Sequence, residues 1–168
     1  MKRIVISLGS NIDREAKIRF ALVCLERQFP DIEISRIFET RPVGFDGPDF
    51  FNLVAGFVSD QSYEEVREIL KDIEKQAGRE AGAKSYGSRV LDIDILLFGD
   101  QVLQPDFNVP RDEILKFAYV LQPLAELYPD MLHPETGQRF ADMWSGFYDP
   151  EQQTAAVVID LSPSRASA

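Results

Sequence analysis

Short apolar blocks, separated by turn-forming residues, divide most of the chain into a regular series of elements. Four blocks are typical of strands: RIVISL at 3–8, IEISRIFET at 32–40, FFNLVAGFV at 50–58 and GSRVLDIDILLF at 87–98. Two stretches between them have helical spacing, one carrying Ile18, Leu22, Leu25 and Phe29, the other Val66, Ile69, Ile73 and Ala77. Ser62 and Glu65 are spaced as a capping box at the start of the second helix.

The resulting order, β-α-β-β-α-β, predicts an α+β fold with a ferredoxin-like βαββαβ core and an antiparallel sheet. After Gly99, the segment VPRDEILKFAYVLQPLAELYPD predicts a short helical extension toward the C-terminus that covers the second sheet face, so helices lie on both faces. We expect a single domain over residues 1–150. Residues 151–168 are expected to form a tail that is partly disordered or adds an edge strand through AAVVIDL.

Charge and cysteine content narrow the classes of partner and the compartment. Acidic residues outnumber Lys and Arg by 28 to 18, and the net charge of −10 disfavours nucleic acid and anionic lipid as partners. The single cysteine, Cys24, excludes an intramolecular disulfide and fits a reducing compartment. The N-terminal MKRIVISLGSN has too short an apolar run for a signal peptide or a membrane span. We therefore expect a cytoplasmic protein without a membrane partner.

Two acids, Asp92 and Asp94, interrupt the otherwise apolar block at 87–98. Because strand side chains alternate, both carboxylates project from one face together with Leu96 and Phe98. The other face, toward the two helices, is expected to carry Leu91, Ile93, Ile95 and Leu97. The acids either face solvent or share a cation, and Mg²⁺ with substrate phosphates is the cation that suits such a pair.

Three cations, Arg79, Lys84 and Arg89, precede or begin this block. A solvated basic loop is one interpretation, and a polyphosphate site beside a metal is the other. Neither GxxxxGK[ST] nor GxGxxG is present, so a nucleotide would be held by side chains and metal. The only histidine, His133, lies in a turn-like segment and is expected to be structural, which disfavours a histidine-dependent triad.

These motifs resemble the 6-hydroxymethyl-7,8-dihydropterin pyrophosphokinase family over roughly residues 2–135. The resemblance rests on SLGSN, TRPVG followed by PDFFN, IEKQAGR, GSRVLDIDILLFG and VPRDEILKFAYVLQPLAELYPDMLHP. It implies Mg²⁺-dependent transfer of pyrophosphate from ATP to the pterin hydroxymethyl group, with release of AMP, in folate biosynthesis. It also implies the ferredoxin-like fold, and we expect a monomer.

Matching positions imply roles for individual residues. Asp92 and Asp94 match the acids that hold two Mg²⁺ ions, and Arg79 and Arg89 are expected to share the catalytic centre with them. The expected ATP contacts are Glu74, Arg79, Lys84, Arg89, Arg111 and Lys116. The expected pterin contacts are Thr40, Val43, Phe50, Asn52, Tyr86 and Tyr119. Aromatic rings and an Asn amide suit a flat bicycle with a donor and acceptor edge.

The chain departs from the family pattern near its ATP-side cations. Arg111 stands where many members have His, and Phe117 where many have Arg, with Lys116 next to it. Arg41 replaces a frequent Pro. Two alternatives therefore remain beside the pterin enzyme: a related kinase for another hydroxymethyl heterocycle, and a pterin- or nucleotide-binding module that has lost activity.

Overall fold

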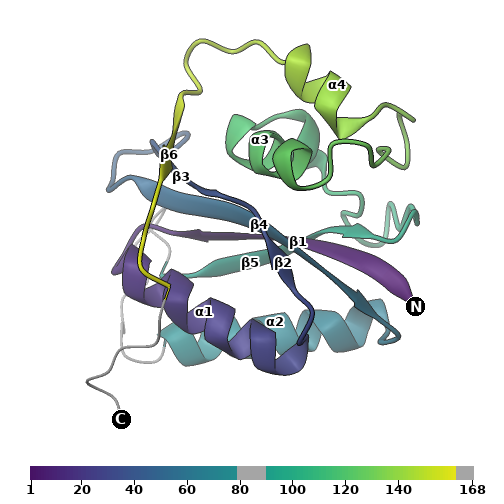
Figure 1. Cartoon of the computed structure of the whole chain (residues 1–168), viewed down its shortest axis with the longest axis horizontal. Coiled ribbons are helices and arrows are strands. Elements are labelled where there is room, and N and C mark those ends of the chain that lie inside the picture. Colours follow the sequence, from purple (N-terminus) through teal and green to yellow (C-terminus); the bar gives the residue numbers. More distant parts are fainter. Residues whose placement is uncertain (79–89, 162–168) are drawn as a thin grey trace.

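The computed structural model describes residues 1–78 and 90–161, and these form a six-stranded antiparallel sheet. Its strands are β1 (Lys2–Ser10), β2 (Glu33–Ile34), β3 (Ile37–Thr40), β4 (Phe50–Ser59), β5 (Asp92–Phe98) and β6 (Thr154–Val157). The strand order is β5-β1-β4-β3-β6, and β2 pairs separately with β4. The two long strands β1 and β4 lie side by side in the middle of the sheet, with β5 beyond β1 and β3 beyond β4 (Figure 1).

Helices cover both faces of the sheet (Figure 1). One face carries α1 (Arg14–Gln28) and α2 (Tyr63–Gly78), and the other carries α3 (Ala118–Leu127) and α4 (Phe140–Ser145), preceded by the 3-10 helix η1 (Asp112–Leu115). Each layer encloses its own apolar cluster. The predicted antiparallel sheet with helices on both faces is confirmed.

The start of α2 has the predicted capping box. The Ser62 N–H donates to Glu65 Oε2 and the Glu65 N–H donates to Ser62 Oγ, both at 3.2 Å. These two bonds satisfy amides that have no partner within the helix. The buried face of α2 includes Leu70, whereas Ile69, which the spacing assigned to that face, is only partly buried at its edge.

The block at 32–40 forms two strands rather than the one predicted. Ile34 pairs with Ala55 and Phe38 with Asn52, so four steps along one chain oppose three along the other. The extra residue is accommodated at Ser35, whose N–H donates to Val54 O at 2.8 Å while its Oγ accepts from Val54 N at 2.9 Å. A side-chain oxygen thus replaces a backbone acceptor, which breaks the ladder into β2 and β3.

The block at 87–98 begins its strand only at Asp92, and residues 87–89 lie outside the described part. Its pairing with β1 shifts register, because Ile6 opposes Ile95 and Val5 opposes Leu97. Leu96 is therefore an extra, bulged residue, and the alternation of faces is reset after it.

The bulge corrects two predicted orientations. Leu97 lies in the cluster beneath α3 rather than facing α1 and α2, and Phe98 lies in the α1–α2 cluster rather than on the acids' face. Asp92 and Asp94 precede the bulge, so their shared face is unaffected by the shift.

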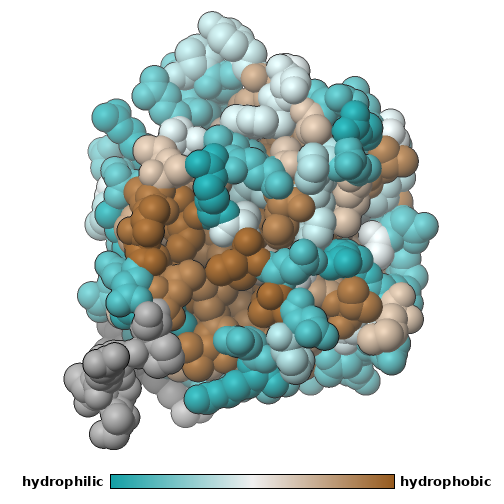
Figure 2. All heavy atoms as spheres, in the orientation of Figure 1, coloured by the Kyte–Doolittle hydropathy of each residue, from teal (hydrophilic) through white to brown (hydrophobic). Residues whose placement is uncertain are grey.

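β6 forms one edge of the sheet. It pairs with β3, with Ile37 opposite Val157 and Thr40 opposite Thr154. Seen from the side of Figure 1, apolar side chains gather in one patch below the α3–α4 layer, over α1 and the sheet end near β6 (Figure 2). Within the described residues, no helix is long and apolar enough to cross a membrane.

His133 has a structural role, as predicted. Its side chain is buried, and Nδ1 accepts hydrogen bonds from the backbone N–H groups of Glu135 and Thr136 at 3.1 and 3.2 Å. Burial lowers the pKa of the His133 imidazole. The ring therefore holds the turn after residue 133 and is not available as a base.

Candidate active site

The sheet face beneath α3 changes from apolar to polar along three adjacent strands. Val5, Val54 and Leu97 lie under α3 within its apolar cluster. Farther along the same strands, Asn52 opposes Gly9, and Gly9 opposes Asp92, which makes one row across β4, β1 and β5. Ser7 lies opposite Asp94 in the neighbouring row. Because directly opposed residues share a face, the polar groups lie together where the cover of α3 ends.

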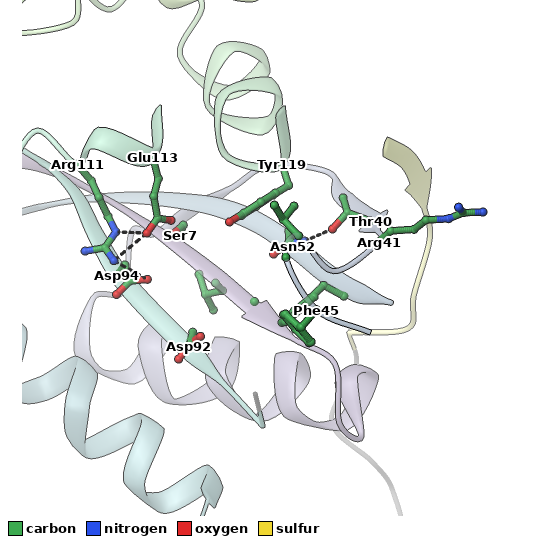
Figure 3. A pocket seen from close by; sticks show the side chains of 15 residues that line it. Ser7, Thr40, Arg41, Phe45, Asn52, Asp92, Asp94, Arg111, Glu113 and Tyr119 are labelled. Atoms are coloured by element: carbon green, nitrogen blue, oxygen red, sulfur yellow. Dashed lines mark hydrogen bonds and ion pairs between the residues drawn. The ribbon is translucent and has the colours of Figure 1, made fainter. Parts of the chain in front are cut away.

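A cavity of about 650 Å³ occupies this uncovered part of the face. Its floor comes from β1, β4 and β5, and its walls come from the loop after β3, η1 with the residue before it, and the first turn of α3. Charged side chains lie at one end, and aromatic and amide side chains lie at the other (Figure 3).

The uncharged end is organised around Asn52, which is only 7% exposed. Asn52 Nδ2 donates to Thr40 Oγ1 at 2.6 Å, so the orientation of the amide is fixed from β3. Gly9 leaves space for this amide, because a Cβ at Gly9 would lie 2.8 Å from Asn52 Oδ1. The glycine of SLGSN is thus required for close side-chain approach rather than for a turn.

Aromatic rings enclose the same end. Phe45 and Phe50 contact edge to face, with ring centroids 6.2 Å apart and planes at 88°. Tyr119 stacks on Phe117 with centroids 5.1 Å apart and planes at 15°. Burial raises the pKa of Tyr119, and the nearby carboxylates of Glu113 and Asp94 raise it further, so the ring stays a neutral phenol. This end offers apolar faces and a fixed amide to a flat, uncharged ligand.

The charged end joins Asp94, Arg111 and Glu113. Arg111 Nη2 lies 3.6 Å from Asp94 Oδ2 and 2.9 Å from Glu113 Oε1, and its Nε donates to Glu113 Oε1 at 3.0 Å. Burial lowers the pKa of Arg111, but the charges of Asp94 and Glu113 outweigh that effect and raise it overall. Arg111 is therefore a permanent cation beside the predicted metal ligands.

Glu74, on α2, bonds to the backbone of β5 between the two acids. Its Oε2 accepts a hydrogen bond from the backbone N–H of Ile93 at 3.0 Å, between Asp92 and Asp94. Burial raises the pKa of Glu74 to about 7, and the charges of Asp92 and Asp94 add to this, while the bond from Ile93 opposes it. Glu74, an expected ATP contact, does not line this cavity or the smaller cavity beside it.

A smaller cavity of about 260 Å³ adjoins the charged end and shares Asp94 and Arg111 with it. Its other lining residues come from α2, from β5 and from the segment before η1. They include the cations Arg67 and Lys71 and the ring of Tyr63. A ligand with an anionic part could therefore lie with that part at Asp94 and Arg111 and extend along α2.

The structure brings together many, but not all, of the predicted site residues. The main cavity is lined by the predicted residues Thr40, Val43, Phe50, Asn52, Asp92, Asp94, Arg111 and Tyr119. Lys116 does not line it and is paired instead with Asp112 at 2.9 Å, largely exposed. Arg79, Lys84, Tyr86 and Arg89 lie outside the described residues.

Several lining residues were not predicted: Ser7, Gly9, Arg41, Phe45 and Glu113. Ser7 and Gly9 belong to the SLGSN motif, so the motif could have indicated that these two residues lie at the site. Nothing in the sequence indicated Glu113, because its role depends on Arg111, which it bonds and which lies beside Asp94 only in the folded chain. Arg41 lines the cavity, but its side chain points away from it (Figure 3).

The donor set fits a hard divalent cation that a substrate helps to hold. Among residues 1–78 and 90–161, no group of three or more His, Cys, Asp or Glu side chains could hold a metal. The two carboxylates of Asp92 and Asp94 remain, and Mg²⁺ is commonly bound by one or two carboxylates with substrate phosphates completing its shell. The site therefore fits Mg²⁺ only together with a phosphate-bearing ligand.

Comparison with known proteins gives consistent matches. A family model described as 7,8-dihydro-6-hydroxymethylpterin-pyrophosphokinase (HPPK) matches residues 5–129. A 2-amino-4-hydroxy-6-hydroxymethyldihydropteridine pyrophosphokinase from Pseudomonas aeruginosa is 36% identical over 141 residues, covering 80% of this chain and 86% of that protein. The protein of the same description from Bacillus subtilis is 32% identical over 148 residues, covering 83% and 88%.

Solved structures show the same fold at low sequence identity. A crystal structure of an HPPK-DHPS in complex with substrates superposes with a TM-score of 0.65 and 14% identity, covering 85% of this chain. The wild-type HPPK-DHPS of Plasmodium falciparum gives a TM-score of 0.64 and 12% identity, covering 86%. This chain spans 43% of each of those two longer chains.

Proposed function

Because the chain belongs to the 7,8-dihydro-6-hydroxymethylpterin-pyrophosphokinase family and is therefore a pyrophosphokinase, we propose that it transfers pyrophosphate from ATP to 6-hydroxymethyl-7,8-dihydropterin. AMP is the second product, and the reaction belongs to folate biosynthesis. One observation carries this proposal: a single cavity joins an aromatic and amide end to an end with two strand carboxylates and an arginine. The strand order β5-β1-β4-β3 supports a ferredoxin-like description of the core.

The pterin lies at the uncharged end in this proposal. Its ring stacks between the aromatic walls, and its donor and acceptor edge pairs with the Asn52 amide, whose orientation the 2.6 Å bond to Thr40 fixes. The hydroxymethyl group then points along the row from Asn52 through Gly9 toward Asp92. Substrate binding thus places the nucleophile at the acids without movement of the sheet.

ATP occupies the charged end and the adjoining smaller cavity. The two cavities meet at Asp94 and Arg111, so the triphosphate crosses this point while the nucleoside lies against α2. Arg67 and Lys71 bring two positive charges to that path, and Asp106 brings one negative charge. Side chains and metal thus take over the phosphate contacts that a glycine-rich loop provides in other nucleotide sites.

Asp92 and Asp94 would hold Mg²⁺ together with the substrate phosphates, and the family resemblance implies two ions. When bound, Mg²⁺ would neutralise charge on the phosphates and help to align the nucleophile with the leaving group. The pterin hydroxymethyl oxygen forms a bond to the β-phosphorus, and the bond from that phosphorus to the α,β-bridging oxygen breaks. AMP leaves with the electron pair of the broken bond, and the hydroxyl proton is released.

Arg111 changes partners during binding in this scheme. Its guanidinium lies 3.6 Å from Asp94, whose charge it neutralises, and 2.9 Å from Glu113. Glu113 keeps Arg111 at the site when Asp94 is engaged elsewhere, so the guanidinium becomes free to pair with phosphate oxygens. Arginine suits this role because it is charged at every working pH and binds phosphate bidentately.

One incubation tests the function. The protein is mixed with ATP, Mg²⁺ and 6-hydroxymethyl-7,8-dihydropterin, and nucleotides and pterins are separated afterwards. AMP formed in equal amounts with pterin pyrophosphate supports the proposal, and EDTA is expected to abolish both. ADP in place of AMP indicates γ-phosphoryl transfer, and a complete lack of turnover favours a binding module or a different heterocycle as substrate.

A further inference from the structure

Residues 149–157, which follow α4, lie outside the part of the chain matched by the family model at 5–129. In Figure 1 this segment descends from α4 past the start of α3 and enters the sheet as β6 beside β3. It therefore contacts two elements, α3 and β3, that each supply a lining residue at the uncharged end of the cavity. These residues are Tyr119 on α3 and Thr40 on β3.

Gln152 connects the segment to the start of α3. Its Oε1 accepts a hydrogen bond from the backbone N–H of Ala118 at 2.8 Å. Its Nε2 donates to the backbone carbonyl of Lys116 and to Asp149 Oδ2, both at 2.9 Å. A side chain 34 residues along the chain thus contacts the backbone on both sides of Phe117.

These bonds supply the cap that α3 lacks locally. Phe117 is the N-cap residue of α3 and has no side-chain oxygen or nitrogen with which to bond the first-turn amides. An uncapped first turn has N–H groups without helical partners and frays more readily. Since Tyr119 directly follows Ala118 and its ring stacks on Phe117, the position of Tyr119 depends on this cap.

The same segment also pairs with β3, which carries Thr40. Thr154 pairs with Thr40 in the β3–β6 ladder, and Thr154 Oγ1 bonds to Gln122 Oε1 on α3. Thr40 in turn orients the Asn52 amide. Residues 149–157 therefore link α3 and β3 from outside the cavity, without contributing to the charged end.

We propose that Gln152 is a positioning residue that sets the affinity for the pterin, and not for ATP, by capping α3 and holding Tyr119 over the cavity. This inference rests on the proposed pyrophosphokinase function. It assigns to the segment beyond the family match a direct influence on substrate affinity. The charged end, which includes Asp94 and Arg111, has no bond to the segment among the described contacts.

The test compares Gln152→Ala with Gln153→Ala, a matched change at the neighbouring exposed glutamine. Steady-state AMP release gives the KM for pterin, the KM for ATP and kcat, and equilibrium binding of pterin is measured with Mg²⁺ and a non-hydrolysable ATP analogue. We expect Gln152→Ala to raise the pterin KM and dissociation constant about 5- to 10-fold, the loss of one or two hydrogen bonds. The ATP KM, kcat and the Gln153→Ala protein are expected to stay within about twofold of wild type.

The outcomes are distinguishable. If wild-type protein releases no AMP, the proposed function fails, whatever the variants do. If wild type is active and Gln152→Ala leaves the pterin KM unchanged, or raises both KM values equally, the positioning role is wrong. If Gln152→Ala does not fold in a melting experiment, Gln152→Glu decides by the same criteria. It keeps the acceptor for the Ala118 N–H but loses both donors and places a carboxylate oxygen against Asp149 and the Lys116 carbonyl, so a rise in pterin KM with an unchanged ATP KM is expected here too.

Discussion

Gly9→Ala tests whether the absence of a side chain at Gly9 is what allows the Asn52 amide to keep its orientation. The added Cβ would lie 2.8 Å from Asn52 Oδ1, closer than nonbonded atoms normally approach. The amide of Asn52 is the far end of a side chain, so it can turn away while the sheet stays intact. Turning breaks its 2.6 Å hydrogen bond to Thr40 and removes the amide from its binding orientation. The substitution therefore acts on Asn52 rather than on the strand.

The expected loss of pterin affinity can be worked out from the hydrogen bonds that the Asn52 amide would lose. A lost hydrogen bond costs about 0.5–1.5 kcal/mol, and a buried polar group left without a partner costs about 1–3 kcal/mol. Asn52 is buried at 7% exposure, and in the proposed complex its amide binds the pterin edge. We therefore expect pterin affinity to fall by about 1–3 kcal/mol, a rise in pterin KM of roughly 5- to 150-fold. The KM for ATP is expected to stay unchanged, because the charged end is untouched.

The assay is steady-state AMP release at varied pterin and ATP. Gly146→Ala at the end of α4 is the control, since its Cβ would have only ordinary contacts, the nearest at 3.6 Å. Asn52→Ala and the double variant that carries both Gly9→Ala and Asn52→Ala complete a double-mutant cycle. Without the amide the added Cβ meets nothing polar, so Gly9→Ala is expected to add no further loss to Asn52→Ala. An unchanged pterin KM in Gly9→Ala, or full additivity in the double variant, would refute the reasoning.

Three further perturbations address the charged end. Asp92→Asn and Asp94→Asn are each expected to abolish AMP release while the thermal unfolding temperature stays near that of wild type; near-normal rates with Mg²⁺ in either variant would rule out their role as metal ligands. Arg111→Ala should raise the ATP KM about tenfold or more, through loss of a charge-assisted contact, with the pterin KM unchanged. An unaltered ATP dependence would show that Arg111 only neutralises Asp94. Burial raises the pKa of Glu74 from 4.5 to about 7, so between these pH values the folded protein keeps a proton that the unfolded chain loses. The free energy of unfolding, measured in EDTA, should therefore decrease as the pH rises from 4.5 to 7. Glu74→Gln should remove roughly 1–2 kcal/mol of that fall after allowance for partial exposure; an identical pH profile in denaturant unfolding would contradict this.

Local sequence features predicted much of the fold and part of the site. The capping box at Ser62 and Glu65 was readable because its two bonds join residues three apart. The shared face of Asp92 and Asp94 followed from strand alternation alone, and the register with β1 bears it out. The same alternation predicted the wrong face for Leu97, because the bulge at Leu96 arises only in the pairing of β5 with β1.

The sequence by itself determined the order of elements, the family resemblance and the placement of two acids on one strand face, because each is encoded within a short stretch. Only the tertiary structure decided which groups meet those acids. Arg111 pairs with Asp94, and the Gln152 side chain accepts a hydrogen bond from the Ala118 N–H at the start of α3, across sequence separations at which local propensity carries no information. These contacts form only when packing of two apolar clusters against the sheet brings distant segments together. The polar site therefore lies where the cover of α3 ends, a position set by packing rather than by any motif.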